Sequence, residues 1–360
     1  MGFRILGGSI WDHFFKLSVA AFYTISLIAL SSCDRKEQTP KWDKPQKVAH
    51  ASEVASEPTR ERSRLAAASP KTEKPLEATP DGQTASLRFI CYNVENWLTM
   101  DRYHDQKSLK NSPKPESEKQ AVIRILSRHT PDVIGLSEIG QPSDLAEIQQ
   151  RLKTAGLDFP HSQYASGSDM TRRLGFLSRF PISSTSNSAE LEYRLAGQTH
   201  TMNRGILDAT VAANDKNYRF LGVHLKSKRE SEQGDQEAIR LNEARLLRRH
   251  VNSILEEDAD ARVIVYGDFN DTRGMPTIKA VTGNYHDPTY LTAIPAKDSH
   301  GETWTHFWEP NDVYSRLDFV MVARALRSEV DFPAARIIDD AEWIQASDHR
   351  PILVIFKSVR

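Results

Sequence analysis

Two short polar turns, about eighty residues apart, lie at the ends of apolar, strand-like runs. Gly267-Asp268-Phe269-Asn270 follows the run at residues 263–266, and Ser347-Asp348-His349 precedes the run at residues 351–356. Strand ends are where a sheet protein commonly positions its chemistry. Carboxylate, amide and imidazole groups together can hold a hard cation, orient a water molecule and stabilise a phosphoryl oxygen. The two turns therefore predict an enzyme that hydrolyses phosphate esters.

The composition changes near residue 86 of the 360-residue chain. Residues 34–86 are rich in Pro, Lys, Glu, Ala, Ser and Thr, and they lack aliphatic periodicity, so they cannot bury enough apolar surface to offset the entropy of ordering. From residue 87 onward, apolar runs alternate with turn signals and no repeat of fixed period is visible. We therefore expect a disordered tether over residues 33–86 and one catalytic domain over residues 87–360.

The amino terminus has the pattern of a bacterial lipoprotein. The apolar stretch at residues 17–30 follows Arg4 and Lys16. It is too short for a comfortable bilayer span, which favours the core of a signal peptide. It ends in Leu30-Ser31-Ser32-Cys33, a tetrapeptide that resembles the lipobox. We predict a signal peptide over residues 1–32 and a lipidated Cys33 that anchors an extracytoplasmic protein to the inner or outer membrane. An uncleaved membrane anchor is the alternative.

The charge balance argues against a generally basic surface. Residues 1–86 carry 12 Lys and Arg against 10 Asp and Glu, and the rest of the chain carries 35 against 38. Sequence-independent attraction to nucleic acid usually needs clustered cations. The local basic groups at Arg172-Arg173 and residues 226–229 could serve this purpose or could simply be solvated. Any nucleic-acid substrate must therefore be held by local groups and a metal.

Hydrophobic periodicity predicts alternating strands and helices in the domain. Strands are expected at residues 87–94, 132–136, 174–177, 203–211, 218–224, 263–266, 317–322 and 351–356, and amphipathic helices at residues 118–129 and 236–255. Alternation along the first strand should put Asn93 and Glu95 on one face. The second strand delivers Glu138 to its carboxyl end, where a carboxylate needs a positive partner. Cys91 is expected in the core, and residues 100–115 are expected to form a substrate loop or a solvated one.

The order of these motifs resembles the endonuclease/exonuclease/phosphatase superfamily, which includes DNase I-like nucleases, inositol phosphatases and bacterial sphingomyelinases. The resemblance covers nearly all of residues 87–360. The motifs that carry it are Tyr-Asn-Val, Leu-Ser-Glu, Gly-Phe-Leu-Ser-Arg-Phe-Pro-Ile, Gly-Val-His, Gly-Asp-Phe-Asn, Arg-Leu-Asp-Phe and Ser-Asp-His. It implies an α/β (α+β) fold of the DNase I-like type. This fold is a four-layer α-β-β-α sandwich with two mixed sheets face to face, outer helices and an active site at one rim.

The resemblance also implies a set of metal ligands. Glu138 is expected to be the principal ligand, with Asn93, Glu95 and Asp348 around the same ion or a second one. Oxygen donors without thiolates favour Mg²⁺ or Mn²⁺, with Ca²⁺ as a further candidate. Many relatives carry Asp at the position of Glu95, so a solvent-facing role is the alternative for this residue.

Five further residues take catalytic roles by the same resemblance. Asp268 is expected to orient or deprotonate the attacking water, and Asn270 to donate a hydrogen bond to a nonbridging phosphoryl oxygen. His349 should contact the phosphate, with Asp318 holding its imidazole and raising its pKa. His224 is expected to be a second phosphate contact, with an edge-of-core histidine as the alternative. Either Asp268 or the His349-Asp318 pair would supply the general base.

The substrate is less determined than the chemistry. Residues 224–228 and the stretch from Gly234 to Arg245 resemble secreted bacterial nucleases, and Lys226 and Lys228 could follow flanking phosphates. Three aromatic residues before Asp318 could stack a base or pack in the core: Trp304, Phe307 and Trp308.

We therefore predict a metal-dependent phosphoester hydrolase, an extracytoplasmic endonuclease or phosphodiesterase that cleaves nucleic acid by in-line water attack. The alternatives are a phosphomonoesterase or lipid phosphodiesterase of the inositol phosphatase or sphingomyelinase kind, and an inactive phosphate-binding module. No apolar hairpin suited to lipid insertion is visible in the sequence. No protein partner is predicted, and we expect a monomer.

Overall fold

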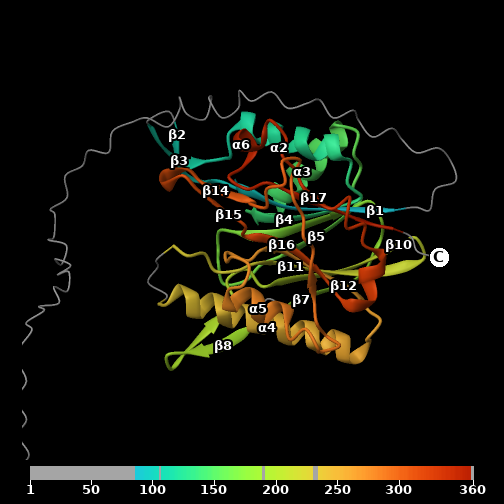
Figure 1. Ribbon diagram of the computed structural model, residues 1–360. Coiled ribbons are helices and arrows are strands. Elements are labelled where there is room, and N and C mark those ends of the chain that lie inside the picture. Colours follow the sequence, from blue (N-terminus) through green and yellow to red (C-terminus); the bar gives the residue numbers. More distant parts are fainter. Residues whose placement is uncertain (1–85, 105–106, 189–190, 230–233, 358–360) are drawn as a thin grey trace, which may run out of the picture. The chain divides into compact units, whose positions relative to one another are not determined.

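The computed structural model describes residues 86–104, 107–188, 191–229 and 234–357 (Figure 1). The predicted signal peptide over residues 1–32, the lipidated Cys33 and all but the last residue of the predicted tether lie outside these ranges. Within the described ranges, no helix is long and apolar enough to cross a membrane.

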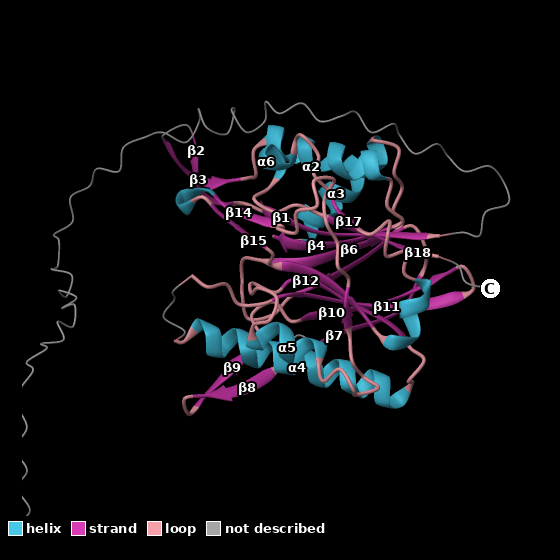
Figure 2. Ribbon diagram, in the orientation of Figure 1, coloured by secondary structure: helices cyan, strands magenta, loops and turns pink. Residues whose placement is uncertain are grey.

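Two six-stranded mixed sheets form the centre of the domain (Figure 2). The first has the order β17-β18-β1-β4-β6-β5, with β1 parallel to β4 and antiparallel to β18. The second has the order β13-β16-β12-β11-β10-β7, with β12 parallel to β11 and antiparallel to β16. The strands of the first sheet are β1 (Leu87–Trp97), β4 (Val133–Ile139), β5 (His161–Ala165), β6 (Arg173–Ser178), β17 (Arg336–Ile337) and β18 (Ile352–Phe356). Those of the second are β7 (Ile182–Ser188), β10 (Ile206–Ala213), β11 (Lys216–His224), β12 (Arg262–Asp268), β13 (Thr292–Ala293) and β16 (Asp318–Val322).

Helices cover the outer face of each sheet (Figures 1 and 2). On the first sheet lie α2 (Glu116–His129), α3 (Pro142–Thr154) and α6 (Trp343–Ala346), and on the second lie α4 (Gln236–Glu257) and α5 (Pro276–Thr282). Buried side chains form three separate clusters, one between the sheets and one under each helical layer. The predicted four-layer α-β-β-α sandwich is therefore confirmed.

Aromatic side chains pack the two sheets against each other. The Phe89 ring lies 4.9 Å from the ring of Phe220 and 5.0 Å from that of Tyr266. Gly135 leaves room for this packing, because a Cβ there would lie 2.0 Å from the Tyr266 ring. Cys91 is buried in the same core, as expected. Close packing of this kind fixes the relative positions of the strand ends.

Several elements were not expected from the sequence. Residues 100–115 contain a hairpin of β2 (Met100–His104) and β3 (Lys107–Ser112), where a loop was predicted. Two more hairpins are formed by β8 (Glu192–Leu195) with β9 (Gln198–Thr201), and by β14 (His306–Trp308) with β15 (Val313–Ser315). The 3-10 helices are η1 (Glu309–Asn311) and η2 (Arg324–Glu329). Strands β5 and β7 end their sheets, and their polar sequences hide the apolar alternation on which prediction relies.

Candidate active site

Strand register places three of the predicted catalytic residues side by side on the second sheet. Asp268 is the last residue of β12 and pairs with His224 of β11 on one side and with Asp318 of β16 on the other. Gly267 precedes Asp268 with a φ of 133°, and a Cβ there would lie 1.9 Å from the carbonyl oxygen of Val223. Only glycine therefore allows β12 to pass so close to β11 at this point.

His349 comes from the first sheet, in the turn before β18, and completes a buried group. Its Nδ1 lies 2.7 Å from Oδ2 of Asp318, which is the predicted contact. Its Nε2 lies 3.7 Å from Oδ2 of Asp268. The Asn93 amide donates to the same Asp268 oxygen at 3.2 Å. We call Asn93, Asp268, Asp318 and His349 the buried cluster, because each is at most 5% exposed.

Burial and mutual charge shift the proton affinities in the buried cluster. Burial, reinforced by the neighbouring Asp318 and opposed by His349, raises the pKa of Asp268 to about 7. Burial alone would lower the pKa of His349, but Asp318, Asp348 and Asp268 together raise it well above its usual value. Burial lowers the pKa of His224, and the nearby cations Arg204 and Arg172 lower it further.

The three carboxylates among the predicted metal ligands, Glu138, Glu95 and Asp348, lie beside the buried cluster and are more exposed. Oε2 of Glu138 accepts a hydrogen bond from the backbone N–H of Asn96 at 2.9 Å, and its Oε1 lies 3.4 Å from Nδ2 of Asn93. Glu95 accepts from the backbone N–H of Asp348 at 3.1 Å. Three residues of this region have left-handed backbone, with φ of 46° at Glu95, 57° at Asn96 and 66° at Glu138. Regular alternation along β1 therefore stops after Asn93, so the predicted common face of Asn93 and Glu95 is not maintained by strand geometry.

The chemistry of the three carboxylates suits a hard divalent cation. Glu138, Glu95 and Asp348 supply carboxylate oxygens, which such ions prefer. The positive partner that a carboxylate at Glu138 requires is Arg172, whose Nε lies 3.7 Å away. Asn93 turns its N–H groups toward Glu138 and Asp268, while its Oδ1 accepts from the Glu95 amide at 3.1 Å. Asn93 therefore acts in this arrangement as a hydrogen-bond donor that joins the two groups.

Asn270 lies next to Asp268 but is tied to the loop after β11. Its backbone N–H donates to Oδ1 of Asp268 at 2.8 Å, and its side-chain amide donates to the carbonyl oxygen of Leu225 at 2.9 Å. His224 is buried, with its Nε2 3.6 Å from Oδ2 of Asp268. All nine predicted site residues thus lie at one edge of the sandwich, and the side chains of Asn93, His224 and His349 each approach Asp268.

The sequence analysis missed His306. Its Nε2 lies 3.7 Å from Oδ2 of Asp348, and its ring centroid lies 4.6 Å from that of His349. The preceding residue, Thr305, ties this segment to the start of β16, because its hydroxyl accepts hydrogen bonds from the backbone N–H groups of Leu317 and Asp318. Of the three aromatic candidates, Phe307 is buried and Trp304 packs on the Arg350 guanidinium, whereas Trp308 is exposed.

Basic side chains border the site on the side of His224. The Arg172 Nε donates to Oδ1 of Asn96 at 2.8 Å, whereas the adjacent Arg173 is buried. Arg204 is 6% exposed and pairs with Asp169, and its Nε and Nη1 have no hydrogen-bond partner among the described residues. Lys226 follows β11. We call Arg172, Arg204 and Lys226 the basic border.

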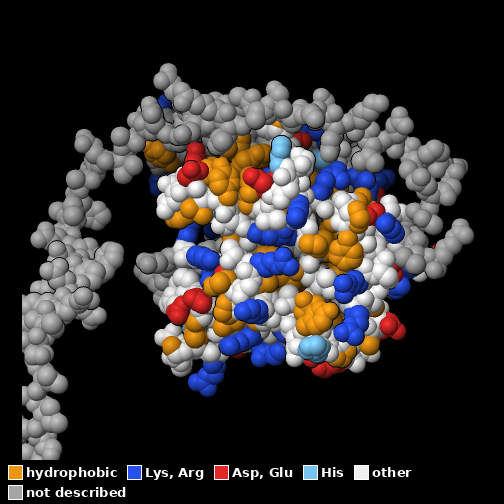
Figure 3. Space-filling view, viewed as in Figure 1, with side chains coloured by type: hydrophobic (Ala, Val, Ile, Leu, Met, Phe, Trp, Pro, Cys, Tyr) orange, Lys and Arg blue, Asp and Glu red, His pale blue; other side chains and the backbone are white. Residues whose placement is uncertain are grey.

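Two residues of α4 fix the backbone of Lys226. The buried Glu243 accepts from the Lys226 amide at 2.7 Å and from the backbone and side chain of Asn203. Arg240 donates to the Lys226 carbonyl at 3.1 Å. On the face that Figure 3 shows, basic side chains are scattered among apolar and acidic ones. Within the basic border, Lys226 has its own anchors on α4.

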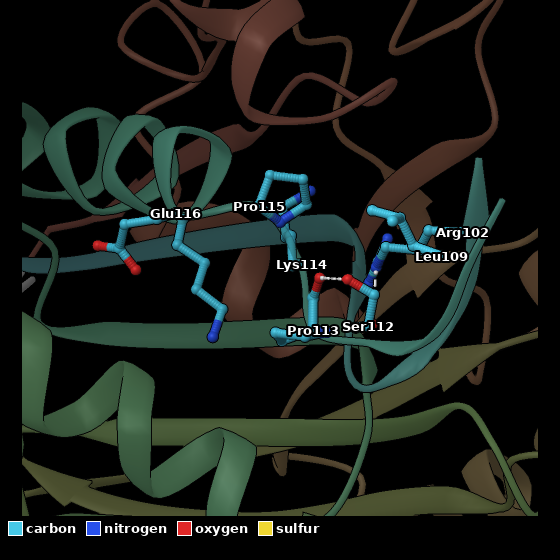
Figure 4. Close-up of a pocket in the computed structure, with 8 residues that line it drawn as sticks. Arg102, Leu109, Ser112, Pro113, Lys114, Pro115 and Glu116 are labelled. Carbon is cyan, nitrogen blue, oxygen red and sulfur yellow. Dashed lines mark hydrogen bonds between the residues drawn. The ribbon is translucent and has the colours of Figure 1, made fainter. Parts of the chain in front are cut away.

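A cavity of about 270 Å³ lies between the β2–β3 hairpin and the start of α2 (Figure 4). The predicted site residues do not line this cavity, but two basic side chains that line it donate hydrogen bonds to the backbone of the active-site turn. Arg102 donates to the Asn96 carbonyl at 2.6 Å, and Lys114 donates to the Glu95 carbonyl at 3.0 Å. Arg102 of the hairpin and Lys114, which follows it, thus support the left-handed turn.

A sequence model of the Endonuclease/Exonuclease/phosphatase family matches residues 109–349. The chain belongs to this family. Its members are phosphoester hydrolases that generally use divalent metals. The predicted family is therefore confirmed. A search of curated proteins finds no significant match.

Solved structures with the same fold are distant in sequence. An endonuclease/exonuclease/phosphatase family protein from Leptotrichia buccalis C-1013-b has 16% identity and a TM-score of 0.53, with 75% of this chain and 99% of that chain covered. Sphingomyelinase C from Streptomyces griseocarneus has 14% identity and a TM-score of 0.50, over 76% and 100%. Truncated TDP2 from Caenorhabditis elegans has 15% identity and a TM-score of 0.50, over 76% and 98%. These likenesses show the fold alone.

Proposed function

We propose that this family member is a divalent-metal-dependent phosphodiesterase that cleaves nucleic acid. The observation that carries the proposal is the buried cluster, in which Asp318 holds His349 at 2.7 Å and His349 faces Asp268 at 3.7 Å. Carboxylates for a cation lie on one side of it and the basic border on another. Water activation, phosphoryl binding and charge neutralisation are thus available within one site.

Glu138, Glu95 and Asp348 are the residues that would hold the metal, which we propose to be Mg²⁺, with Mn²⁺ and Ca²⁺ as alternatives. Bound there, the ion would supply neutralisation of the negative charge on the phosphoryl group. Asn93 holds Glu138 and Asp268 in place through its side-chain amide.

The protein's own groups account for the remaining steps. Asp268 orients the attacking water and accepts its proton, because its Oδ2 faces the site while its Oδ1 is held by the backbone N–H of Asn270. His349 directs Nε2 to the phosphoryl group, since its Nδ1 is held by Asp318. His224 and Asn270 contact nonbridging oxygens. Water attacks in line with the leaving oxygen, so no covalent enzyme intermediate forms.

The basic border favours a substrate with more than one phosphate. Arg204 is nearly buried and has two nitrogen atoms without a described partner, which suits a guanidinium that binds an anion. Lys226 is fixed at both its amide and its carbonyl group by α4. A polynucleotide presents phosphates on both sides of the scissile bond, whereas a simple monoester presents none.

A lipid phosphodiesterase is the second candidate, and the β14–β15 hairpin favours it. Trp308, Val313 and Tyr314 of this hairpin are 42–46% exposed. The Phe307 amide donates to the Asp348 carbonyl at 2.9 Å, so the exposed apolar side chains belong to an element that touches the active-site turn. No apolar hairpin suited to lipid insertion is visible in the sequence, and what the structure adds is this short hairpin, in which three partly exposed apolar residues come together.

We also propose that the enzyme acts outside the cytoplasm, as a monomer anchored to a bacterial membrane through lipidated Cys33. The support is the apolar stretch at residues 17–30 and the following Leu30-Ser31-Ser32-Cys33. Metabolic labelling with a fatty acid would test it: wild-type protein should carry label and the Cys33→Ala variant should not.

Hydrolysis assays with the purified full-length protein test the activity. Plasmid DNA, RNA, sphingomyelin and phosphomonoesters would each be incubated with Mg²⁺ or Mn²⁺, with His349→Ala as the control. Metal-dependent cleavage of polynucleotide that the variant lacks would support the proposal. Turnover of lipid or monoester with intact plasmid would replace it with the second candidate or with a phosphomonoesterase, and silence across the panel would favour a binding role.

A further inference from the structure

We propose that His306, Asp348 and His349 form a second metal site that takes an imidazole-preferring transition metal such as Zn²⁺, and that the bound metal inhibits hydrolysis. The inhibitory part rests on the function proposed above, whereas the binding part does not. The site shares Asp348 with the oxygen donors around Glu138 and differs from them in its two imidazoles. It adds His306, a residue for which that function has no use.

Backbone pairing places His306 opposite the active-site turn. His306 of β14 forms a bridge pair with His349, and the flanking bonds are Phe307 amide to Asp348 carbonyl at 2.9 Å and Arg350 amide to Thr305 carbonyl at 2.7 Å. Arg350 strengthens this pairing, because its guanidinium donates to Asp298 at 2.8 Å and lies over the Trp304 ring. The imidazole of His306 is therefore held next to Asp348 by a short, well-anchored strand.

The three candidate ligand atoms are close enough to share an ion. His306 Nε2 lies 3.7 Å from Asp348 Oδ2, and His349 Nε2 lies 3.9 Å from Asp348 Oδ1. One ligand atom from each residue can be chosen so that all lie within 4.8 Å of one another. Four-coordinate zinc with bonds of about 2.0–2.2 Å places its ligands about 3.3–3.6 Å apart. Metal binding would therefore draw the three ligand atoms together by side-chain rotation.

The chemistry of the ligands selects the metal. Two imidazoles and one carboxylate suit zinc and its neighbours better than Mg²⁺, which prefers oxygen. Asp318 already holds Nδ1 of His349 at 2.7 Å, which leaves Nε2 for the metal in the carboxylate–histidine–metal arrangement common in such sites. The side chains of His306 and Asp348 are 18% and 33% exposed, so an ion can enter from solvent.

Occupation of this site would remove two groups that hydrolysis needs. The Nε2 of His349 would no longer be available to the phosphoryl group, and Asp348 would no longer be available to the hard cation at Glu138. Inhibition by zinc should therefore be relieved by excess Mg²⁺ or by high substrate concentration. Loss of the His306 imidazole should weaken the binding of zinc without removing any group that the hydrolytic function uses.

Cobalt spectroscopy and zinc inhibition with the full-length protein test the proposal. Co²⁺ replaces zinc as a visible probe, and wild-type protein should develop the intense absorption of a four-coordinate ion with one equivalent. His306→Gln should lose this absorption, while the exposed His286 supplies the control variant His286→Gln, which should keep it. The zinc concentration for half-inhibition of Mg²⁺-supported hydrolysis should rise about tenfold or more in His306→Gln alone.

Each outcome bears on a separate part of the proposal. Equal cobalt spectra in wild type and His306→Gln would overturn the site, and cobalt binding with no inhibition by zinc would overturn the inhibitory part. If the protein hydrolyses none of the phosphate esters, the proposed function fails, but a cobalt spectrum that depends on His306 still supports the site. Thermal unfolding checks that His306→Gln folds, and His306→Asn repeats the test with a shorter amide.

Discussion

The two sheets contribute to the candidate active site in different ways. The second sheet supplies His224, Asp268 and Asp318 from consecutive register positions at regular strand ends. The first sheet supplies Glu95 and Glu138 from left-handed backbone, with φ of 46° and 66°. The second sheet therefore places buried charge on paired strand residues, and the first sheet places partly exposed charge on non-glycine residues with left-handed backbone.

This difference separates two kinds of cost. A non-glycine residue held at positive φ costs about 1–3 kcal/mol, which must be offset by surrounding contacts. Arg102 and Lys114 provide such contacts by donating to the carbonyls of Asn96 and Glu95. At Asp268 the cost is instead that of desolvating a carboxylate, and this burial raises the pKa of Asp268 to about 7. We infer that the second sheet handles protons, while the first gathers carboxylates for a cation.

Replacing Asp268 by Asn tests the proton-handling side most strongly. The amide keeps the size of the side chain but cannot accept a proton from water, so kcat should fall about 10³-fold. Thermal stability should be nearly unchanged, because the lost attraction to His349 is offset by the removal of the cost of burying the carboxylate charge. Steady-state hydrolysis and thermal unfolding measure the two effects. A variant that keeps most of its activity would exclude Asp268 as the base and leave the role to His349 with Asp318.

Replacing Asp318 by Asn tests the same side through His349. The amide cannot hold Nδ1 of the protonated ring as the carboxylate does at 2.7 Å, so kcat should fall about 10²-fold. Asp318 acts through His349, so the change should also move the pH dependence of kcat/KM. An unaltered pH profile with reduced activity would indicate a structural role for Asp318 instead.

Replacing Glu138 by Gln tests the first sheet. The neutral amide is a weaker ligand, so the Mg²⁺ concentration for half-maximal activity should rise about tenfold to a hundredfold, with much of kcat recovered at high Mg²⁺. Activity should be lost in a chelator and return with Mg²⁺ or Mn²⁺. Titration of activity with Mg²⁺ makes the measurement, and Asp268→Asn is the contrast, because added metal should not rescue it.

The sequence predicts the second sheet better than the first. Asp268, Asp318 and His224 lie at the ends of apolar runs, which predicts their places at strand ends, and the family resemblance implies that they share one site, as the strand register places them. The contacts around Glu95, Asn96 and Glu138 do not follow in the same way. Positive φ at a non-glycine residue has no reliable sequence signal, and the bonds that hold Asn96 in this turn come from Arg102 and Arg172, which the sequence does not single out for that role.

His306 shows the second limit of sequence reasoning. Its place in the site depends on a bridge to His349, 43 residues further along the chain. Strand β14 has only three residues, too few for periodicity to register. Helix α3, which is absent from the predicted elements, is a different case. Its residues Leu145, Ile148 and Leu152 have the apolar spacing of a helix, so the sequence does contain the signal for it.

The smallest expected effect concerns the basic border, where two lysines that look equivalent in the sequence differ in the structure. Lys226 has its backbone fixed by Glu243 and Arg240, whereas Lys228 pairs with Asp271 at 3.3 Å. Lys226→Met should raise the KM for polynucleotide about fivefold and reduce its salt dependence by about one phosphate contact. Hydrolysis of a small diester such as bis(p-nitrophenyl) phosphate should not change, because it has no flanking phosphate. Lys228→Met is the matched control, and an equal effect from both lysines would mean that general surface charge, not the anchored position of Lys226, holds the substrate.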